Sequence, residues 1–316
     1  MTRFIVRRLW SVIPIFFGIS VVGFVLMKMV PGDPTFYLLG PWAGQAARDA
    51  LLVKLGWDQP LPVQYYKWLI NFLQGDFGKS VTYDAPVSTI LGERIVNSGI
   101  LAGISFAIAA VLGFGGGIIA AIKQYSLIDR VITGTAIALA SAPVYWLGLL
   151  LVFFFGLLLG VLPVSGMHSL DQDGQVLDLL RHAVLPAFTT ALIPMAVILR
   201  FTRSTMSDAL GQAYVQAARA RGLTERSVIL RHATRNILAP IVNITGLQLG
   251  FIFGAALFSE VIFAWPGIGL LMFDAIGTRD VSVIQAVVIF TGALFVTINL
   301  IADITQALID PRTAEH

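Results

Sequence analysis

Along the chain, long runs of apolar residues without Asp, Glu, Lys or Arg are separated by shorter polar segments. A membrane-spanning helix needs about 20 mostly apolar residues, and a charge at its centre costs about 2.5 to 3.5 kcal/mol. The pattern therefore predicts an all-α membrane protein with six transmembrane helices. The charge-free runs cover 9–27, 95–122, 131–170, 182–199, 236–259 and 281–302.

The run at 131–170 is 40 residues long. We expect one span in it, because two spans of about 20 residues leave no polar turn between them. Pro143 is predicted to mark a kink in this span and Pro163 its exit. The expected spans are a first transmembrane helix within 1–30 and five further helices at about 97–122, 131–161, 183–203, 240–262 and 282–305.

The distribution of basic residues predicts the orientation. With the N-terminus in the cytoplasm, 13 of the 21 Lys and Arg residues lie inside. Five of the others fall in the segment 31–96, which is long enough to escape the positive-inside rule. Both termini are therefore predicted to be cytoplasmic. The N-terminal arginines and apolar run resemble a secretory signal, but no small-residue cleavage site follows, so we expect this segment to remain as the first helix.

Two segments outside the predicted spans are long enough to fold. Segment 31–94 carries apolar residues at helical spacing, broken by Gly75-Asp76-Phe77-Gly78, and is predicted to form a small extracytoplasmic cap. The membrane core covers 95–307 and contains the polar cytoplasmic segment 207–240, called the hairpin below. Residues 308–316 are predicted to form a cytoplasmic tail.

The overall composition agrees with a membrane protein. Hydrophobic residues make up 57% of the 316 residues and charged residues only 12%, about half the share of about 25% in soluble proteins. This composition excludes an ordinary soluble protein. The net charge of +3 gives no indication of nucleic-acid binding, and the absence of cysteine excludes disulfides, thiolate metal sites and a cysteine nucleophile.

The hairpin has the signals of two short helices joined by a turn. Segment 212–221 is rich in Ala, Gln and Arg, Gly222 interrupts it, and Thr224 is suited to cap a second helix. Pro240 is predicted to stand where the next span begins. A rigid helical hairpin presents a docking surface that transmits movement to the spans beside it. From spacing alone, an ordinary amphipathic connector is the alternative.

The residues of the hairpin resemble a known signature. Permease subunits of binding-protein-dependent ABC importers carry Glu-Ala-Ala, three residues and Gly, followed by Ile-x-Leu-Pro. The similar residues here are Gln216-Ala217-Ala218-Arg219-Ala220-Arg221-Gly222 and Ile237-Leu238-Ala239-Pro240. Gln216 replaces the signature Glu and Ala239 its Leu, and the long interval between the two parts resembles that of the peptide and nickel branch.

Similarity to this branch extends over nearly the whole chain. Its members resemble this sequence at an ordered set of short motifs: Pro31-Gly32-Asp33-Pro34, Leu55-Gly56-Trp57-Asp58-Gln59-Pro60-Leu61, Gly75-Asp76-Phe77-Gly78-Lys79-Ser80, Arg200-Phe201-Thr202-Arg203-Ser204, Trp265-Pro266-Gly267-Ile268-Gly269, Arg279-Asp280, Val283-Ile284-Gln285 and Asp310-Pro311-Arg312. Each motif is weak by itself, and the ordered set is specific.

The resemblance implies the first of two permease subunits of an ATP-driven importer, with the type I ABC importer permease fold and a place in the bacterial plasma membrane, the inner membrane of a Gram-negative cell. Its implied partners are a similar second permease subunit, two cytoplasmic ABC ATPase subunits and an extracytoplasmic solute-binding protein. ATP and Mg²⁺ are expected in the ATPases, and no cofactor in this chain. The cargo stays open among a dipeptide, an oligopeptide, glutathione, an opine-like compound and a nickel chelate. The implied ATPase-coupling loop contains Gln216, Ala217, Ala218, Gly222, Leu223 and Pro240.

The sequence predicts that the energy source lies outside this chain. Lys79-Ser80 follow Gly78 as in a phosphate loop, but the first glycine of such a loop is replaced by Leu73. An ion-coupled secondary transporter is the alternative class, yet such carriers bury ionisable residues in mid-membrane and the predicted span interiors contain none. A catalytic or metal-binding role is not expected, because no metal-ligand spacing and no accompanying carboxylate is found around His168, His182, His232 and His316.

The predicted span after Pro240 contains small and polar residues with two expected roles. Gly246, Gly250 and Gly254 recur at four-residue spacing, which favours close helix packing in lipid, and we expect this seam to let helices slide between outward and inward states. Gly113 and Gly117 repeat the spacing. The candidate pathway-lining residues are Asn243, Gln248 and Asn299, with interhelical hydrogen bonding as their alternative role.

Overall fold

The computed structural model describes residues 2–29, 39, 44–169 and 175–309, and apart from one β-bridge between Lys79 and Pro86 its regular elements there are helical. Four helical segments in this part are long and apolar enough to cross a membrane: α5 (Val87–Ile122), α8 (Val176–Leu210), Glu225–Ile262 and the Val281–Ala302 part of α13 (Val281–Ile309). A bent pair of helices makes a fifth span if it is counted as one. The first helix, α1 (Thr2–Met29), adds a shorter apolar section, Trp10–Val25. The all-helical membrane fold is confirmed, and six spans stays a prediction.

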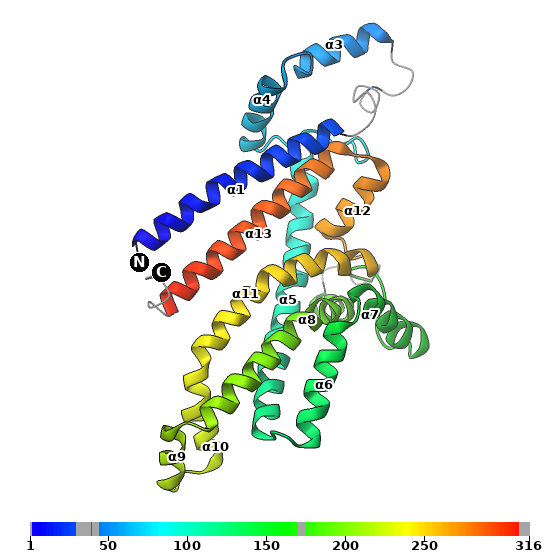
Figure 1. Cartoon of the computed structure of the whole chain (residues 1–316). Helices are drawn as coiled ribbons and strands as arrows, with labels where there is room; N and C mark the ends of the chain where they lie inside the picture. The colour runs from blue at the N-terminus through cyan, green and yellow to red at the C-terminus, as the bar shows by residue number, and fades with distance from the viewer. Residues whose placement is uncertain (1, 30–38, 40–43, 170–174, 310–316) are drawn as a thin grey trace. The chain divides into compact units, whose positions relative to one another are not determined.

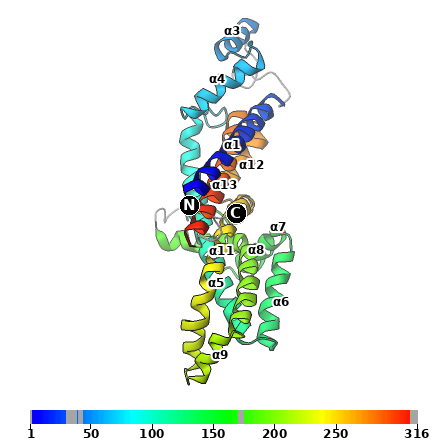
Figure 2. The ribbon, with the colours of Figure 1, turned by 60° about the vertical axis from the view of Figure 1, so that its left-hand side comes forward.

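The chain divides into two compact units. Among the described residues, the first holds 2–4, Asn97–Leu270 and 298–309, and α8 is its central helix. In α8, 78% of the most apolar window is buried, compared with 33% in α5 and in Glu225–Ile262. Helix α8 packs against α6 (Leu127–Ser141), α7 (Val144–Leu151) and α11 (Thr234–Ile262), as the two views in Figures 1 and 2 show.

Helix α5 approaches α8 at two glycines, four residues apart. A Cβ atom on Gly113 would lie 2.9 Å from the carbonyl oxygen of Met195, and one on Gly117 would lie 2.7 Å from that of Leu199. Neither distance leaves room for a side chain. The glycine pair therefore allows the two backbones to pack closely, which favours helix association where lipid surrounds the protein.

The predicted third span is broken at Pro143. Helix α6 ends at Ser141, α7 begins at Val144 and continues as the π-helix η1 (Val152–Leu158), and the axes before and after the break differ by 110°. Proline has no amide hydrogen to donate to the preceding turn, and its ring disfavours helical geometry in the residue before it. The change of direction at Pro143 is confirmed, but it is a break rather than a kink in one continuous helix over 131–161.

A buried carboxylate organises the turn after α11. Glu260 is fully buried and accepts hydrogen bonds from Ser98 Oγ at 2.5 Å and from the Gly269 amide at 2.6 Å. A Cβ on Gly267 would lie 2.3 Å from the carboxyl carbon of Glu260. The Trp265 indole donates to the carbonyl of Asn97 at 2.9 Å. The Trp-Pro-Gly-Ile-Gly motif thus folds around Glu260 and ties the start of α12 (Ile268–Thr278) to α5.

The second unit holds Ile5–Val96 and Leu271–Thr297. The expected helices of the cap are present as α3 (Gln45–Leu55) and α4 (Leu61–Leu73), while residues 31–38 and 40–43 lie outside the described residues. Helix α4 packs on α1 through aromatic rings. The ring centroids of Tyr65 and Phe24 lie 5.4 Å apart, and the Tyr65 hydroxyl lies 2.7 Å from Ser20 Oγ. Helix α13 contacts α1 at Gly23, where a Cβ would lie 2.7 Å from Ile289.

The turn that follows α4 is held by a buried aspartate. Asp280 accepts a hydrogen bond from Ser80 Oγ at 2.5 Å and another from the Thr82 amide at 3.1 Å. On the outer side of this turn, a hydrogen bond from Lys79 and its positive charge hold the pKa of the exposed Asp84 carboxyl below its usual value. The motif Gly-Asp-Phe-Gly-Lys-Ser therefore serves as a structural turn that is anchored at the start of α13.

Candidate coupling surface

The first helix of the hairpin is α9 (Ala213–Ala220), and it ends in a Schellman turn. The Leu223 amide donates to the Ala218 carbonyl at 3.4 Å and the Gly222 amide to the Arg219 carbonyl at 2.9 Å. Gly222 has φ of +77°, a left-handed conformation that strains residues with a Cβ. The predicted glycine turn is confirmed, and backbone conformation is the reason for glycine here.

Two further contacts hold the turn in place. Thr224 caps α10 (Glu225–Ser227) by accepting a hydrogen bond from the Ser227 amide at 3.4 Å, as its sequence position predicts. The Arg219 guanidinium donates to both carboxylate oxygens of Glu225, at 2.7 and 3.3 Å. Because this ion pair is exposed, its contribution to stability is small, but its two-point geometry fixes the direction in which α10 leaves the turn.

A hydrophobic cluster beneath the hairpin joins it to the long helices. Val215 and Ala218 of α9 are buried together with Met206 of α8, Ala121 of α5 and Ile237 of α11. Since buried apolar side chains are closely packed, a displacement of α9 is transmitted to these helices rather than absorbed. The hairpin is therefore expected to move together with the adjoining parts of α5, α8 and α11.

The predicted coupling residues divide between the two faces of α9 and the turn. Ala218 faces the cluster, whereas Gln216 and Ala217 are exposed. Leu223 is 40% exposed beyond the turn. Tyr214, which the sequence reasoning did not include, is 39% exposed. The exposed surface of small, polar and aromatic side chains around Ala217 is called the coupling surface below.

Pro240 lies inside a continuous helix rather than at the start of one, and its place at the beginning of the membrane span stays a prediction. Helical structure is continuous from Glu225, passes through the π-helix η2 (Val228–Ala233) and becomes α11 at Thr234, so Pro240 lies inside a helix. The charged residues that end at Arg235 lie on this same helix. Charge marks where a membrane can begin, but it does not interrupt backbone hydrogen bonding.

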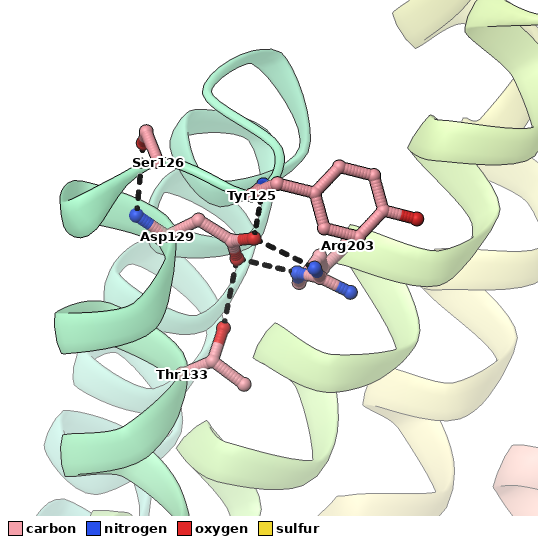
Figure 3. A network of polar contacts seen from close by, with 5 residues as sticks. All are labelled: Tyr125, Ser126, Asp129, Thr133 and Arg203. Atoms are coloured by element: carbon pink, nitrogen blue, oxygen red, sulfur yellow. Dashed lines mark hydrogen bonds and ion pairs between the residues drawn. The ribbon is translucent and has the colours of Figure 1, made fainter.

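An ion pair that the sequence reasoning missed joins the start of α6 to α8. Figure 3 shows Asp129, at the start of α6, facing Arg203 of α8. The guanidinium donates to the two carboxylate oxygens at 2.6 and 2.7 Å, and Asp129 also accepts from the Tyr125 amide at 2.9 Å and from Thr133 Oγ1 at 3.2 Å. Arg203 lies in a motif that the resemblance already singled out, but its partner is 74 residues away.

The candidate pathway and packing residues have different surroundings. Asn243 lines an apolar pocket together with Gly246, while Gln248 is buried on the side of α11 that carries Ile241 and Ile252. Asn299 is half-buried on α13 and Gly250 is buried on α11. A Cβ on Gly246 or Gly254 would meet no atom within 4 Å in the described chain. Gly113 and Gly117, by contrast, both make close contacts with α8.

Two histidines do have a carboxylate beside them, contrary to expectation. Asp178 accepts hydrogen bonds from the amide and hydroxyl of Ser169 at 2.7 and 2.9 Å, and one carboxylate oxygen lies 3.5 Å from Nδ1 of His182 and the other 3.7 Å from Nδ1 of His168. The spacing from 178 to 182 places both residues on one helix face, a signal the sequence reasoning overlooked. Among residues 2–29, 39, 44–169 and 175–309, no group of three His, Cys, Asp or Glu residues is arranged to hold a metal ion.

Comparison with known proteins gives consistent matches. Residues 113–315 match the family described as binding-protein-dependent transport system inner membrane component, and residues 1–100 match the family that describes the N-terminal part of the membrane component of such systems. The oligopeptide transport system permease protein AppB of Bacillus subtilis is 39% identical over 99% of both chains. The dipeptide transport system permease protein DppB of Escherichia coli K12 is 35% identical over 99% of this chain and 98% of the DppB chain. The glutathione transport system permease protein GsiC of E. coli O1:K1 is 36% identical over 98% of both chains.

The fold also matches a solved structure. A chain of the MetNI methionine ABC transporter in an inward-facing conformation superposes with a TM-score of 0.56 at 15% identity, covering 70% of this chain and 96% of that one. At this identity the likeness concerns the fold alone.

Proposed function

Because the chain belongs to the family of binding-protein-dependent transport system inner membrane components, we propose that it is a permease subunit of an ATP-driven importer for small peptides. The observation that carries this function is that the coupling surface lies on a helical hairpin whose buried cluster joins it to three long helices. The similarity to permeases named for oligopeptides, dipeptides and glutathione favours peptide cargo over a nickel chelate.

The proposed assembly contains this chain, a second permease subunit, two cytoplasmic ATPases and an extracytoplasmic binding protein. ATP and Mg²⁺ bind in the ATPases. This chain has six spans with both termini in the cytoplasm, and its cap contacts the binding protein. The positive-inside distribution of Arg and Lys supports this orientation, because the arginines of the hairpin then lie in the cytoplasm.

In the proposed mechanism, closure of the ATPases pushes on α9 through Ala217 and its exposed neighbours. The cluster around Val215 and Ala218 transmits this movement to α5, α8 and α11. The Asp129–Arg203 ion pair makes the first turn of α6 follow α8. The spans then rock to an outward-facing state that receives cargo from the binding protein. Gln248 and Asn299 remain candidates for the lining of the path, whereas Asn243 lines the apolar pocket described above.

The substitution Ala217→Glu tests this function, because Ala217 is exposed and a new side chain there leaves the buried cluster intact. We expect the variant to insert normally, to lose co-purification of the ATPases and to lose peptide uptake. Ala47→Glu is the matched control, since Ala47 is an exposed alanine on α3 of the cap, and this variant is expected to keep its ATPases. ATPase binding and uptake at the normal level in Ala217→Glu would refute the proposal.

A purified assembly without its ATPases separates this function from the alternative class. The proposal predicts no uptake by such a preparation under any ion gradient. Gradient-driven uptake by the chain alone would identify an ion-coupled secondary transporter instead.

A further inference from the structure

A basic groove lies at the beginning of α11, beside the coupling surface. It is lined by Leu230, Arg231, Thr234, Arg235 and Leu238. Both arginines are exposed, so their guanidinium groups are accessible to a ligand.

The groove adjoins an apolar pocket of about 470 Å³, and Leu238 lines both. The pocket lies between α5, α11 and the part of α13 in the first unit, with walls that include Phe106, Val111 and Ile301. Only three of its 14 lining residues, Asn243, Thr245 and Thr305, have polar side chains, and no lining residue is charged. The basic groove and the apolar pocket therefore present two different chemistries to a single ligand.

The two cavities form one stripe along the helix. Residues 231, 234, 238, 242, 245 and 249 follow the three- and four-residue spacing of a single helix face. At about 1.5 Å per residue, the distance from Leu238 to Leu249 is about 16 Å. This length is about half the 30 Å thickness of the hydrocarbon core, that is, one leaflet of the membrane.

We propose that this stripe binds one anionic phospholipid, with its phosphate between Arg231 and Arg235 and an acyl chain in the apolar pocket. Arginines at a membrane surface attract anionic headgroups, and pockets with basic residues between membrane helices hold such lipids. The site would couple the lipid composition of the membrane to movement of the hairpin, since η2 and Thr234 connect α10 to α11. The placement in the cytoplasmic leaflet rests on the orientation given under the proposed function.

The lipid accounts for features that other occupants leave unused. A free phosphate ion would use the arginines but not the apolar pocket. An acidic segment of an ATPase would likewise contact only the arginines. A hydrophobic peptide side chain in transit would occupy the pocket near Asn243 without needing the basic groove. Only an amphiphile with an anionic head occupies the whole stripe.

Native mass spectrometry of the full chain, purified with its partner subunits, tests the site. The probes are phosphatidylglycerol and phosphatidylcholine at equal mole fractions. We expect preferential retention of phosphatidylglycerol. The double variant Arg231→Gln/Arg235→Gln is expected to bind it about thirtyfold more weakly, from the loss of two surface arginines. Arg130→Gln/Arg200→Gln is the matched control, because both residues are exposed and neither lines the stripe, and its retention is expected to be unchanged.

The variant Gly246→Leu tests the apolar half independently. A Cβ on Gly246 meets no atom within 4 Å in the described chain, so leucine fills the pocket without disturbing the helix packing. We expect a loss of phosphatidylglycerol retention of at least tenfold with normal insertion.

Three results would overturn the lipid site. In the first, the unmodified protein retains the two lipids equally. In the second, the arginine variant binds phosphatidylglycerol normally but loses its ATPases. In the third, Gly246→Leu loses uptake while its retention of phosphatidylglycerol is unchanged. The second assigns the arginines to ATPase docking and the third assigns the pocket to cargo. Failure of the proposed function is distinguished by Ala217→Glu, whose outcome concerns ATPase binding and leaves the lipid measurement interpretable.

Discussion

Replacing Gly222 by alanine isolates the role of its left-handed backbone. A non-glycine residue at φ near +77° costs about 1 to 2 kcal/mol, and alanine regains a fraction of this by restricting the unfolded chain. The net effect expected is about 1 kcal/mol, close to a fivefold shift toward the open turn. A steric contribution is small, because an added Cβ meets no atom within 4 Å in the described chain.

Hydrogen exchange at the Leu223 amide measures this opening, since that amide closes the turn on the Ala218 carbonyl. We expect about fivefold faster exchange in Gly222→Ala and a parallel decrease in ATPase co-purification. Gly211→Ala is the control, because Gly211 ends α8 with φ of −81°, where alanine is unstrained. Gly222→Asn is expected to lie between the two, since asparagine tolerates the left-handed region. Equal exchange in the Gly222→Ala and Gly211→Ala variants would refute the conformational argument.

Three further predictions concern stability. Asp129→Asn removes the charge that faces Arg203. Because the arginine side chain is 26% exposed and partly screened by solvent, we expect a destabilisation of about 2 kcal/mol in thermal unfolding. Adding Arg203→Gln to this variant is expected to cause a smaller additional loss of stability. Gly117→Ala is expected to lower the stability by about 1 to 3 kcal/mol, because its Cβ would lie 2.5 Å from the Cβ of Thr202. The control Gly103→Ala, in open space on the same helix, should raise the melting temperature. Equal effects of the two variants would contradict the close packing of α5 and α8. Asp280→Asn weakens the anchoring of Ser80 and Thr82, so limited proteolysis between residues 75 and 86 is expected to accelerate about tenfold, and unchanged cleavage would show that the turn holds without this carboxylate.

Local chemistry made part of the hairpin predictable. Gly222 and Thr224 were identified correctly because turn glycines and capping hydroxyls act within a few residues of the chain. No helix begins at Pro240, because the boundary of a charged segment is not the boundary of a helix. The alanines of the motif were recognised, but the hydrophobic cluster decides that Ala218 faces inward while Ala217 faces outward.

Contacts between distant segments were beyond the reach of spacing arguments. The Asp129–Arg203 pair requires that α6 and α8 lie side by side, and residue spacing along the chain does not show which helices become neighbours. Glu260 directly follows the charge-free run 236–259, but its burial depends on the fold of the Trp-Pro-Gly-Ile-Gly turn around it. Asp178 and His182 share a helix face, whereas His168 joins them only through the folded loop.

The π-helix η2 determines the rotational phase between the two ends of the hairpin. A π-turn accommodates one residue more than an α-turn, and one residue corresponds to about 100° of rotation about the helix axis. The π-turn at Val228–Ala233 therefore sets the direction in which the Gly222 turn points relative to the Arg231–Leu249 stripe. Deleting one residue within η2 would preserve every residue of the coupling surface and of α11. It would nevertheless rotate the coupling surface about the helix axis relative to α11. The direction in which the coupling surface faces is therefore set by the backbone of η2 and not by the side chains of that surface.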